Sequence, residues 1–248
     1  LGKYEKYATE TFHFDKLLPM NTGAEAVETA LKICRKWAYE KKGIAENRAE
    51  IVVCENNFHG RTTTIISFSN DAVARKNFGP YTDGFIKIEY DNLNALEKVL
   101  KSNKNVAGFL VEPIQGEAGV YVPSAGYLSG AKALCEKYNV LFIADEVQTG
   151  IARTGRLLAT CGNCSCSDKH CSGTPETFVL GELFRDELNK FITTTNLVNS
   201  VRGKGLLNAI LINDTEESST AWDICMALKE NGLLAKPTHG NIIRFAPP

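Results

Sequence analysis

Short apolar runs alternate with amphipathic segments from the start of the chain to about residue 160. The expected strands are 51–54, 85–88, 106–111 and 140–144. The helical periods between the later strands cover 93–100 and 127–138. Strands that alternate with helices in this order predict right-handed parallel crossovers and a layered α/β domain.

A long helix is expected where Thr22 and Gly23 lead into apolar residues spaced three and four apart. Its apolar stripe comprises Val27, Ala30, Leu31, Cys34, Trp37 and Ala38. Glu25 and Glu28 lie in its first turns, where acids suit the positive end of the helix dipole. Thr22 can be a simple N-cap, or the free N–H groups of this turn can hold an anion such as phosphate.

Asp145 follows the apolar run 140–144, at the point where this strand leaves the core. An apolar run that ends in a turn is typical of a strand buried on both faces of a parallel sheet. In open α/β sheets, ligands bind outside the carboxyl ends of the strands. Asp145 therefore either caps the following turn or contributes a carboxylate to a ligand site.

Two further strand ends carry polar strings. Phe58 and Arg61 follow the strand at 51–54, whereas Glu112 and Glu117 follow the strand at 106–111. From the pattern alone, packing explains the aromatic residue, and solvated loop positions explain the three charges.

A polar, cysteine-rich stretch interrupts the pattern after Leu158, and amphipathic periodicity resumes at Leu180. Helices are expected at 180–191 and 220–231, and a Gly-rich turn leads into a strand within 201–212. Helices packed on such short strands indicate a small α+β domain. The expected divisions are a large domain at 1–159, a cysteine-rich segment at 160–179 and a C-terminal domain at 180–248.

Four cysteines in the interrupting segment have to be weighed as a zinc site. They are Cys161, Cys164, Cys166 and Cys171. The first two have the Cys-x-x-Cys spacing of a zinc ligand pair, but no second pair follows at a suitable distance. We therefore expect no metal here, because a disordered loop or a non-native splice product explains the segment better.

The composition, 44% hydrophobic and 23% charged over 248 residues, is that of an ordinary soluble globular protein. The net charge of −1 shows no basic footprint for nucleic acid or an anionic membrane, and no apolar run approaches a spanning length. The N-terminus carries no targeting pattern and lacks an initiator Met, so we expect it to lie within a domain. The remaining cysteines lie in apolar patterns, which indicates a reducing compartment.

Several of these strings together resemble class III aminotransferases, which use pyridoxal phosphate (PLP). The similar segments are the turn at 21–26, the loop at 58–62, the Glu-Pro-Ile-Gln-Gly-Glu string at 112–117 and the strand end at 145–156. Segments 203–210 and 232–248 are most similar to the ornithine aminotransferase branch. The resemblance implies a PLP fold-type I large domain, mainly a parallel sheet flanked by helices, and a partial α+β small domain.

The resemblance also implies roles around the cofactor. The strand-end acid of the family pairs with the protonated pyridine nitrogen, so Asp145 would keep the ring an electron sink. Phe58 would stack on the ring, and Gln148 would lie beside the ring and its 3-hydroxyl. The expected cofactor-binding residues are Thr22, Gly23, Ala24, Phe58, Glu112, Asp145 and Gln148.

In the ornithine branch, ornithine gives its δ-amino group to 2-oxoglutarate, forming glutamate semialdehyde and glutamate. Arg61 would bind the α-carboxylate of ornithine. Arg244 would take a carboxylate of 2-oxoglutarate and pair with Glu117 otherwise. His59 departs from the pattern, since relatives usually carry another aromatic residue there. The family further implies a homodimer or higher homo-oligomer in the mitochondrial matrix or cytoplasm.

One part of the family pattern is absent. Between Leu158 and Leu180, relatives carry a long stretch with the Lys that forms the Schiff base, and the cysteine-rich segment stands in its place. Lys169 and Lys190 do not match the motif. We therefore expect either an ornithine aminotransferase whose chain is incomplete and inactive as written, or a non-catalytic relative that binds PLP or a full-length subunit. A zinc-binding interaction module is a distant third alternative.

Overall fold

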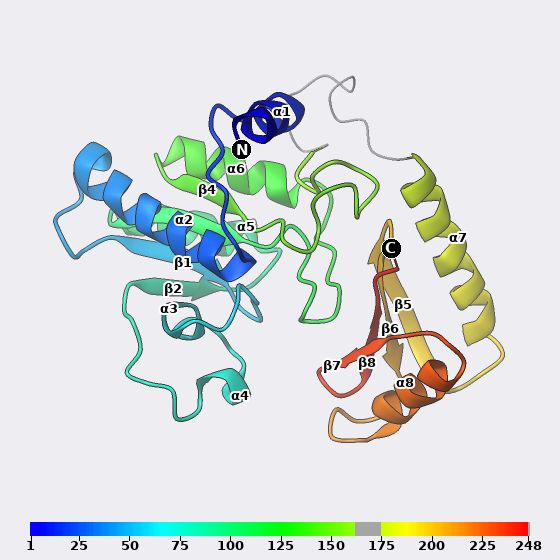
Figure 1. The fold of residues 1–248 in the computed structure, drawn as a ribbon. Coiled ribbons are helices and arrows are strands. Elements are labelled where there is room, and N and C mark those ends of the chain that lie inside the picture. Colours follow the sequence, from blue (N-terminus) through cyan, green and yellow to red (C-terminus); the bar gives the residue numbers. More distant parts are fainter. Residues whose placement is uncertain (162–174, 248) are drawn as a thin grey trace.

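The computed structural model describes residues 1–161 and 175–247, which form two separate sheets with their helices (Figure 1). The helices of the first part are α1 (Gly2–Phe12), α2 (Gly23–Trp37) with its π-helical extension η1 (Ala38–Lys42), α3 (Thr63–Ile66), α4 (Ala72–Arg75), α5 (Leu93–Ser102) and α6 (Tyr127–Lys137). The strands of the first part are β1 (Glu50–Cys54), β2 (Phe85–Ile88), β3 (Val106–Val111) and β4 (Leu141–Ala144). The second part consists of α7 (Pro175–Ile192), β5 (Val198–Lys204), β6 (Leu207–Ile212), α8 (Thr220–Glu230), β7 (Lys236–Thr238) and β8 (Ile242–Phe245).

The first sheet is parallel, with the strand order β2-β1-β3-β4. Ile51 of β1 pairs with Phe85 on one side and with Gly108 on the other. Helices lie in each connection: α3 and α4 between β1 and β2, α5 between β2 and β3, and α6 between β3 and β4. The layered α/β arrangement predicted from the sequence is confirmed.

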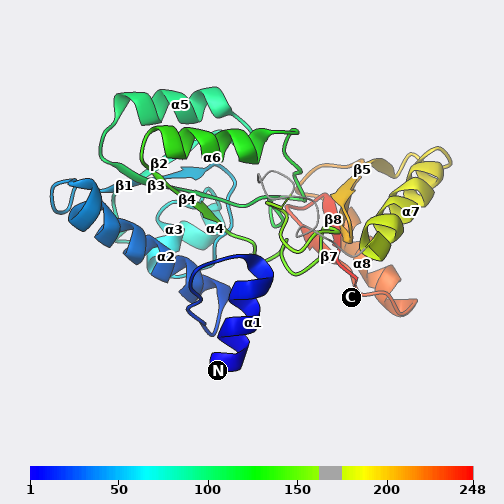
Figure 2. The same ribbon diagram turned by 90° about the horizontal axis from the view of Figure 1, so that it is seen from above.

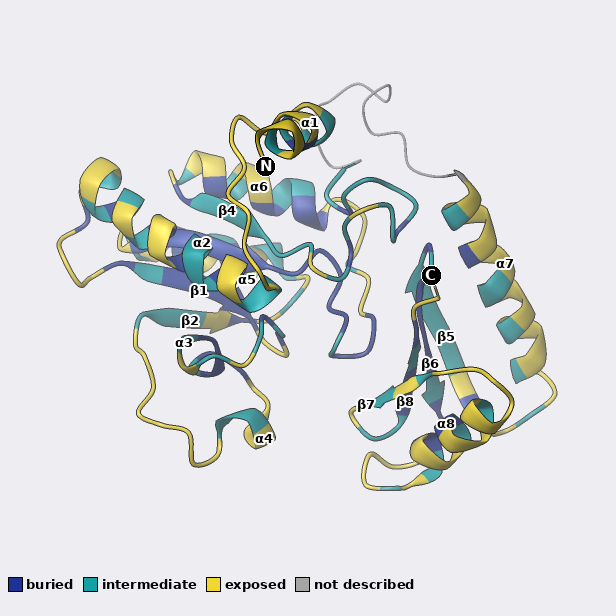
Figure 3. Cartoon of the chain, in the orientation of Figure 1, coloured by how far each residue is buried: buried dark blue, intermediate teal, exposed yellow. Residues whose placement is uncertain are grey.

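Successive residues of β1 enter opposite helical layers, because side chains alternate across a strand. Ile51 and Val53 pack in the cluster that contains the apolar stripe of α2. Val52 and Cys54 pack with residues of α5 and α6. Seen from above, α5 and α6 lie on one side of the sheet and α2 on the other (Figure 2). Both faces of the central strands are therefore buried (Figure 3).

The prediction that 140–144 forms a strand buried on both faces is wrong in its degree of burial. All four residues of β4 are half-buried, whereas every residue of β3 is buried. Within the described residues, β4 pairs only with β3 and forms one edge of the sheet. An edge strand lacks a neighbour on one side, and this explains its exposure despite its apolar sequence.

The second sheet is antiparallel, with the order β5-β6-β8-β7. The sequence predicted one strand within 201–212, but this segment belongs to a hairpin of β5 and β6. Lys204 pairs with Leu207, so Gly205 and Leu206 form a two-residue turn. Gly205 has a φ of +57°, a conformation that tight hairpin turns require. The Gly-rich stretch is thus both strand and turn.

Helices α7 and α8 pack on one face of the second sheet, around a cluster that includes Ile212, Ile243 and Phe245. The other face receives the loop that follows β3, since Ile114 and Val120 pack with Leu207, Ala209 and Ile242 of the sheet. Helix α7 begins at Pro175, five residues before the expected start of periodicity at Leu180. The loop after β3 is consequently held between the two sheets.

The thiols of Cys34, Cys54, Cys135 and Cys225 are free and buried, as their apolar sequence patterns predicted. Burial raises the pKa of the Cys34, Cys54 and Cys135 thiols to about 12. None of the helices in the described part of the chain is long and apolar enough to cross a membrane.

Candidate active site

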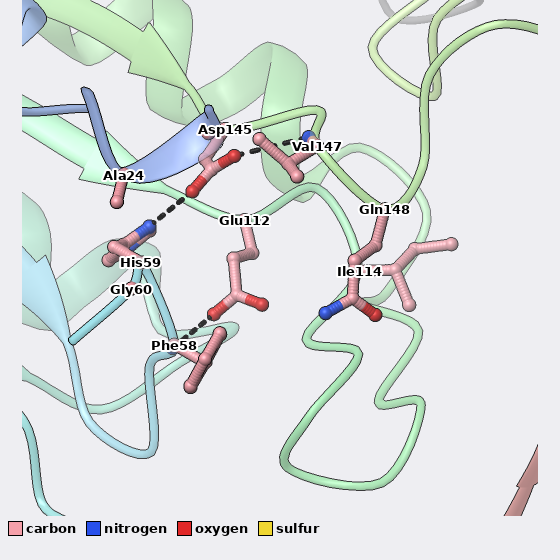
Figure 4. A pocket seen from close by; sticks show the side chains of 10 residues that line it. Ala24, Phe58, His59, Gly60, Glu112, Ile114, Asp145, Val147 and Gln148 are labelled. Atoms are coloured by element: carbon pink, nitrogen blue, oxygen red, sulfur yellow. Dashed lines mark hydrogen bonds and ion pairs between the residues drawn. The ribbon is translucent and has the colours of Figure 1, made fainter. Parts of the chain in front are cut away.

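A pocket of about 170 Å³ lies at the carboxyl ends of the parallel strands (Figure 4). Its walls come from the start of α2 and from the loops that follow β1, β3 and β4. The lining residues are Gly23, Ala24, Phe58, His59, Gly60, Glu112, Ile114, Asp145, Val147 and Gln148. This is where ligands bind in open parallel α/β sheets.

The first turn of α2 is closed by a reciprocal capping box. Thr22 Oγ1 accepts the N–H of Glu25 at 3.2 Å, and Glu25 Oε2 accepts the N–H groups of Thr22 and Asn21, each at 3.0 Å. The N–H groups of Gly23 and Ala24 have no acceptor among residues 1–161 and 175–247. The Thr22 side chain thus serves the helix, and the free donors of the pocket belong to Gly23 and Ala24.

Two glycines let the walls of the pocket approach each other. Gly60 has a φ of +122°, and a Cβ there would lie 2.9 Å from the Cβ of Ala24. A Cβ on Gly23 would lie 2.8 Å from Cγ2 of Val147. A larger residue at either position would displace a wall of the pocket.

Asp145 points from the end of β4 into the pocket (Figure 4). Its Oδ2 lies 2.7 Å from Nδ1 of His59, and its Oδ1 accepts the N–H of Val147 at 3.1 Å. Because a carboxylate can only accept, Nδ1 of His59 carries the proton of this bond. The side chain of His59 is fully buried, and that of Asp145 is 6% exposed. The two side chains therefore form a fixed, desolvated pair at the pocket.

Glu112 is the second buried carboxyl group of the pocket. Its Oε1 accepts the N–H of Phe58 at 2.8 Å, and its Oε2 accepts the N–H of Gly116 at 3.3 Å. Burial raises the pKa of Glu112 to about 7, although the charge of His59 and the Phe58 N–H oppose the shift. Glu112 can therefore hold or release a proton near neutral pH.

Arg61 lies outside this pocket and is exposed. The carbon at the centre of its guanidinium group lies 5.5 Å from the centroid of the Phe58 ring, within range of a cation–π contact. Phe58 and Arg61 also line a second cavity of about 670 Å³, which reaches Glu117, Lys236 and other residues of β7. Phe58 is thus shared between the two cavities.

Glu117 joins the two sheets through an ion cluster. Its Oε1 lies 2.8 Å from Nη1 of Arg244 on β8, and its Oε2 lies 3.0 Å from Nζ of Lys236 on β7. Nη1 of Arg244 also donates to Oε1 of Gln148 at 2.9 Å. Burial alone would raise the pKa of Glu117, but the hydrogen bond from Lys236 and the charge of Arg244 hold it below its usual value. Gln148 links this cluster to the pocket that it lines.

Six of the residues expected to bind the cofactor line one pocket, and Thr22 does not. The six are Gly23, Ala24, Phe58, Glu112, Asp145 and Gln148. The expected pairing of Glu117 with Arg244 is present. The contacts of His59 and Lys236 were not foreseen from the sequence. For His59, the departure from the family pattern at position 59 was the only signal in the sequence. For Lys236, there was no signal in the sequence.

No lysine lines this pocket among the described residues. Lys190 is on α7, where its Nζ pairs with Glu187 at 2.6 Å, and Lys169 falls outside the described residues. Three of the four cysteines in the segment expected to bind no metal, Cys164, Cys166 and Cys171, also fall outside them, and residues 1–161 and 175–247 contain no group of three potential metal ligands.

Curated relatives match the whole chain. It is 48% identical over 302 aligned positions to the mitochondrial ornithine aminotransferase of Drosophila melanogaster, which covers 100% of this chain and 69% of the relative. It is 44% identical to the mitochondrial enzyme of Rattus norvegicus, with 100% and 68% coverage. The alignments run over more positions than the 248 residues of this chain, so these relatives carry residues that have no counterpart here.

Solved structures are similar over the whole chain as well. The acetylornithine aminotransferase of Elizabethkingia anophelis is 52% identical with a TM-score of 0.85, over 74% of that chain. The ornithine aminotransferase of Toxoplasma gondii is 39% identical with a TM-score of 0.91, over 71% of that chain. The class-III aminotransferase family model matches residues 2–173 and 176–248. The chain therefore belongs to the class-III aminotransferase family, as its motifs predicted.

Proposed function

We propose that this chain carries the cofactor pocket and the substrate-binding cations of an ornithine aminotransferase. The observation that carries the proposal is the position of Asp145, whose carboxylate is fixed by His59 inside a pocket that also contains Phe58. The names of the relatives from fly and rat support ornithine as the amino donor. The proposed acceptor is 2-oxoglutarate, which leaves as glutamate, while ornithine becomes glutamate semialdehyde.

The pocket fits PLP in its chemistry. Free N–H groups of Gly23 and Ala24 at the start of a 15-residue helix suit a phosphate. Phe58 suits an aromatic ring, and the Asp145 carboxylate suits a protonated ring nitrogen. A Toxoplasma gondii relative is described with PLP at its active site. When bound, PLP supplies an electron sink for the carbanion of the substrate.

Asp145 would hold the proton of the cofactor's ring nitrogen in place, and His59 would keep the carboxylate oriented and desolvated. Glu112 fixes the backbone of Phe58 through the 2.8 Å hydrogen bond, so it would orient the stacking ring. Gln148 would lie beside the ring of the cofactor, because it lines the pocket and is held by Arg244. Each of these residues binds or orients, and none supplies a basic amine.

The two arginines proposed to bind the substrates do not line the cofactor pocket. Arg61 lines the larger cavity, where its guanidinium group would make a bidentate contact with the α-carboxylate of ornithine. Arg244 would bind a carboxylate of 2-oxoglutarate, for which it must leave Glu117.

N-Acetylornithine is a second candidate donor, favoured by the 52% identity to a structure named as an acetylornithine aminotransferase. The two donors differ in the charge of the α-amino group, whereas the δ-amino group that reacts is the same. Binding of ornithine but not of N-acetylornithine to the PLP-loaded chain supports the first proposal. Equal or tighter binding of N-acetylornithine replaces it with the second.

We further propose that this chain, as written, does not turn over, because no lysine lines the pocket in the described residues. Loss of a general acid–base amine alone lowers rates by roughly 10²–10⁴-fold. The chain would then act as a non-catalytic relative that binds PLP or a full-length subunit. A homodimeric, mitochondrial assembly is proposed from the family and from the mitochondrial names of the relatives.

The test is to mix the purified chain with PLP, reduce with borohydride and map any pyridoxyl-lysine by mass spectrometry. The expected result is PLP binding that Asp145→Ala weakens, without a reducible adduct and without glutamate semialdehyde from ornithine. A single modified lysine together with product formation contradicts the proposed inactivity. Absence of PLP binding contradicts the proposed cofactor site.

A further inference from the structure

Glu117 is a half-buried carboxylate with two cations, one on each oxygen. Arg244 lies 2.8 Å from Oε1, and Lys236 lies 3.0 Å from Oε2. The Glu117 and Arg244 side chains are 16% and 14% exposed, whereas that of Lys236 is 56% exposed. One carboxylate and two cations leave the cluster with a surplus positive charge, and Glu117 and Lys236 line the cavity of about 670 Å³.

The fold keeps Lys236 next to Glu117 independently of Arg244. Lys236 and Arg244 are register partners on the antiparallel strands β7 and β8. Thr238, two residues along β7, donates from Oγ1 to the backbone oxygen of Glu117 at 2.6 Å. Strand β7 therefore holds both the backbone and the carboxylate of Glu117, while Arg244 contacts only the carboxylate.

Removing one partner of a desolvated ion pair is costly, because the other charge is left uncompensated. If Arg244 were the sole partner of Glu117, its departure to a substrate would carry this cost in full. Lys236 has its own oxygen on Glu117 and can stay bound when Arg244 leaves. The arrangement thus reduces the cost of an exchange of partners at Arg244.

We propose that Lys236 is a positioning residue that holds Glu117 while Arg244 binds a carboxylate of a dicarboxylate substrate. This inference rests on the proposed function, since it takes Arg244 as the carboxylate-binding group. Lys236 acts through Glu117 and does not contact the substrate. It is therefore expected to affect the affinity for dicarboxylates without affecting PLP binding.

The experiment measures the dissociation constant of glutarate, a dicarboxylate without a reactive carbonyl, by calorimetry on the full chain loaded with PLP. Lys236→Met is expected to weaken glutarate binding about tenfold, since Arg244 then has to leave Glu117 without a cation. Lys236→Arg keeps the cation and is the matched control, with an affinity close to the wild type. PLP affinity and the melting temperature of both variants are measured alongside, and neither is expected to change.

The decisive comparison uses Glu117→Gln, which removes the charged competitor for Arg244 and is expected to tighten glutarate binding. Adding Lys236→Met to Glu117→Gln is expected to change nothing, because Lys236 acts only through the carboxylate. An additional loss of affinity in the double variant overturns the inference in favour of direct contact with the ligand. Equal affinity of Lys236→Met and the wild type overturns it as well.

Arg244→Met separates this inference from the function on which it rests. If Arg244→Met abolishes glutarate binding while Lys236→Met leaves it unchanged, the proposed function stands and the inference is wrong. If glutarate does not bind the wild type, or binds equally to Arg244→Met, the proposed role of Arg244 is wrong and the inference is overturned with it.

Discussion

Nδ1 of His59 lies 2.7 Å from Oδ2 of Asp145, although 86 positions separate the two residues in the chain. This bond joins the loop after β1 to the end of β4. Nε2 of His59 is buried without a hydrogen-bond partner in the described residues. Among the described residues, the His59 ring is thus held by one hydrogen bond, the one to Asp145, whereas Asp145 also accepts the N–H of Val147.

Replacing His59 by Phe is expected to weaken PLP binding about tenfold and to lower the free energy of unfolding by roughly 1–3 kcal/mol, because the Asp145 carboxylate loses its hydrogen bond to His59 and keeps the one from the Val147 N–H. His59→Asn is the control, since its amide can donate from nearly the same position as Nδ1. PLP titration by fluorescence and urea unfolding measure the two effects. Equal PLP affinity of the Phe variant and the wild type contradicts the role assigned to His59.

Glu112 makes stability fall as pH rises from about 4.5 to 7. Its pKa is about 7 in the folded chain against an ordinary value of 4.5, so the folded state binds more protons in this window. The stabilising contribution is fully present below pH 4.5 and is lost as pH passes 7, by up to roughly 3 kcal/mol.

The test is to compare unfolding of the wild type and Glu112→Gln at pH 5 and pH 8. The Gln side chain keeps an acceptor for the Phe58 N–H and does not titrate. The stability of the wild type relative to Glu112→Gln is expected to be lower at pH 8 than at pH 5. A pH-independent difference would falsify the raised pKa of Glu112.

Gly23→Ala is expected to weaken PLP binding several-fold, because the new Cβ lies 2.8 Å from Cγ2 of Val147 and displaces this side chain, which lines the pocket. Val147 is 65% exposed, so Val147→Ala should be tolerated and should restore binding in the double variant. Gly2→Ala meets no atom within 4 Å and serves as the control. Failure of the double variant to recover indicates that Gly23 is needed for its backbone alone.

Leu207→Ala is expected to cost about 2–5 kcal/mol of stability, since Leu207 is 2% exposed and packs on the loop between the two sheets. Leu234→Ala is the matched control, because Leu234 is 84% exposed, and its effect should stay within about 0.5 kcal/mol. Chemical unfolding followed by circular dichroism measures both. Similar stability of the two variants contradicts a packed interface at Leu207.

The sequence predicted elements wherever burial follows a simple period. Strand β2 at Phe85–Ile88 and strand β3 at Val106–Val111 have the predicted limits, and the N-cap at Thr22 is present. These features depend on neighbours within one turn or one strand. The burial of β4 was overestimated, because its apolar residues do not reveal that one side has no neighbouring strand among the described residues.

Most of the residues expected to bind the cofactor line one pocket, but several of their contacts were not predicted. Family motifs located Asp145 and Glu117, but the partners His59 and Lys236 come from distant parts of the chain. Glu117 and Lys236 are 119 positions apart, and no periodicity relates residues across such a distance. The pKa of Glu112 likewise depends on three loops that meet only after folding.

The outer side of β4 has a further consequence for handling this protein. Leu141, Phe142, Ile143 and Ala144 carry no charge, and no described strand bonds to their outer backbone groups. Natural proteins usually protect an edge strand with lysine, proline or a bulge, because an uncharged edge strand can pair with strands of other molecules. The yield of soluble protein on refolding should therefore fall steeply as the chain concentration rises.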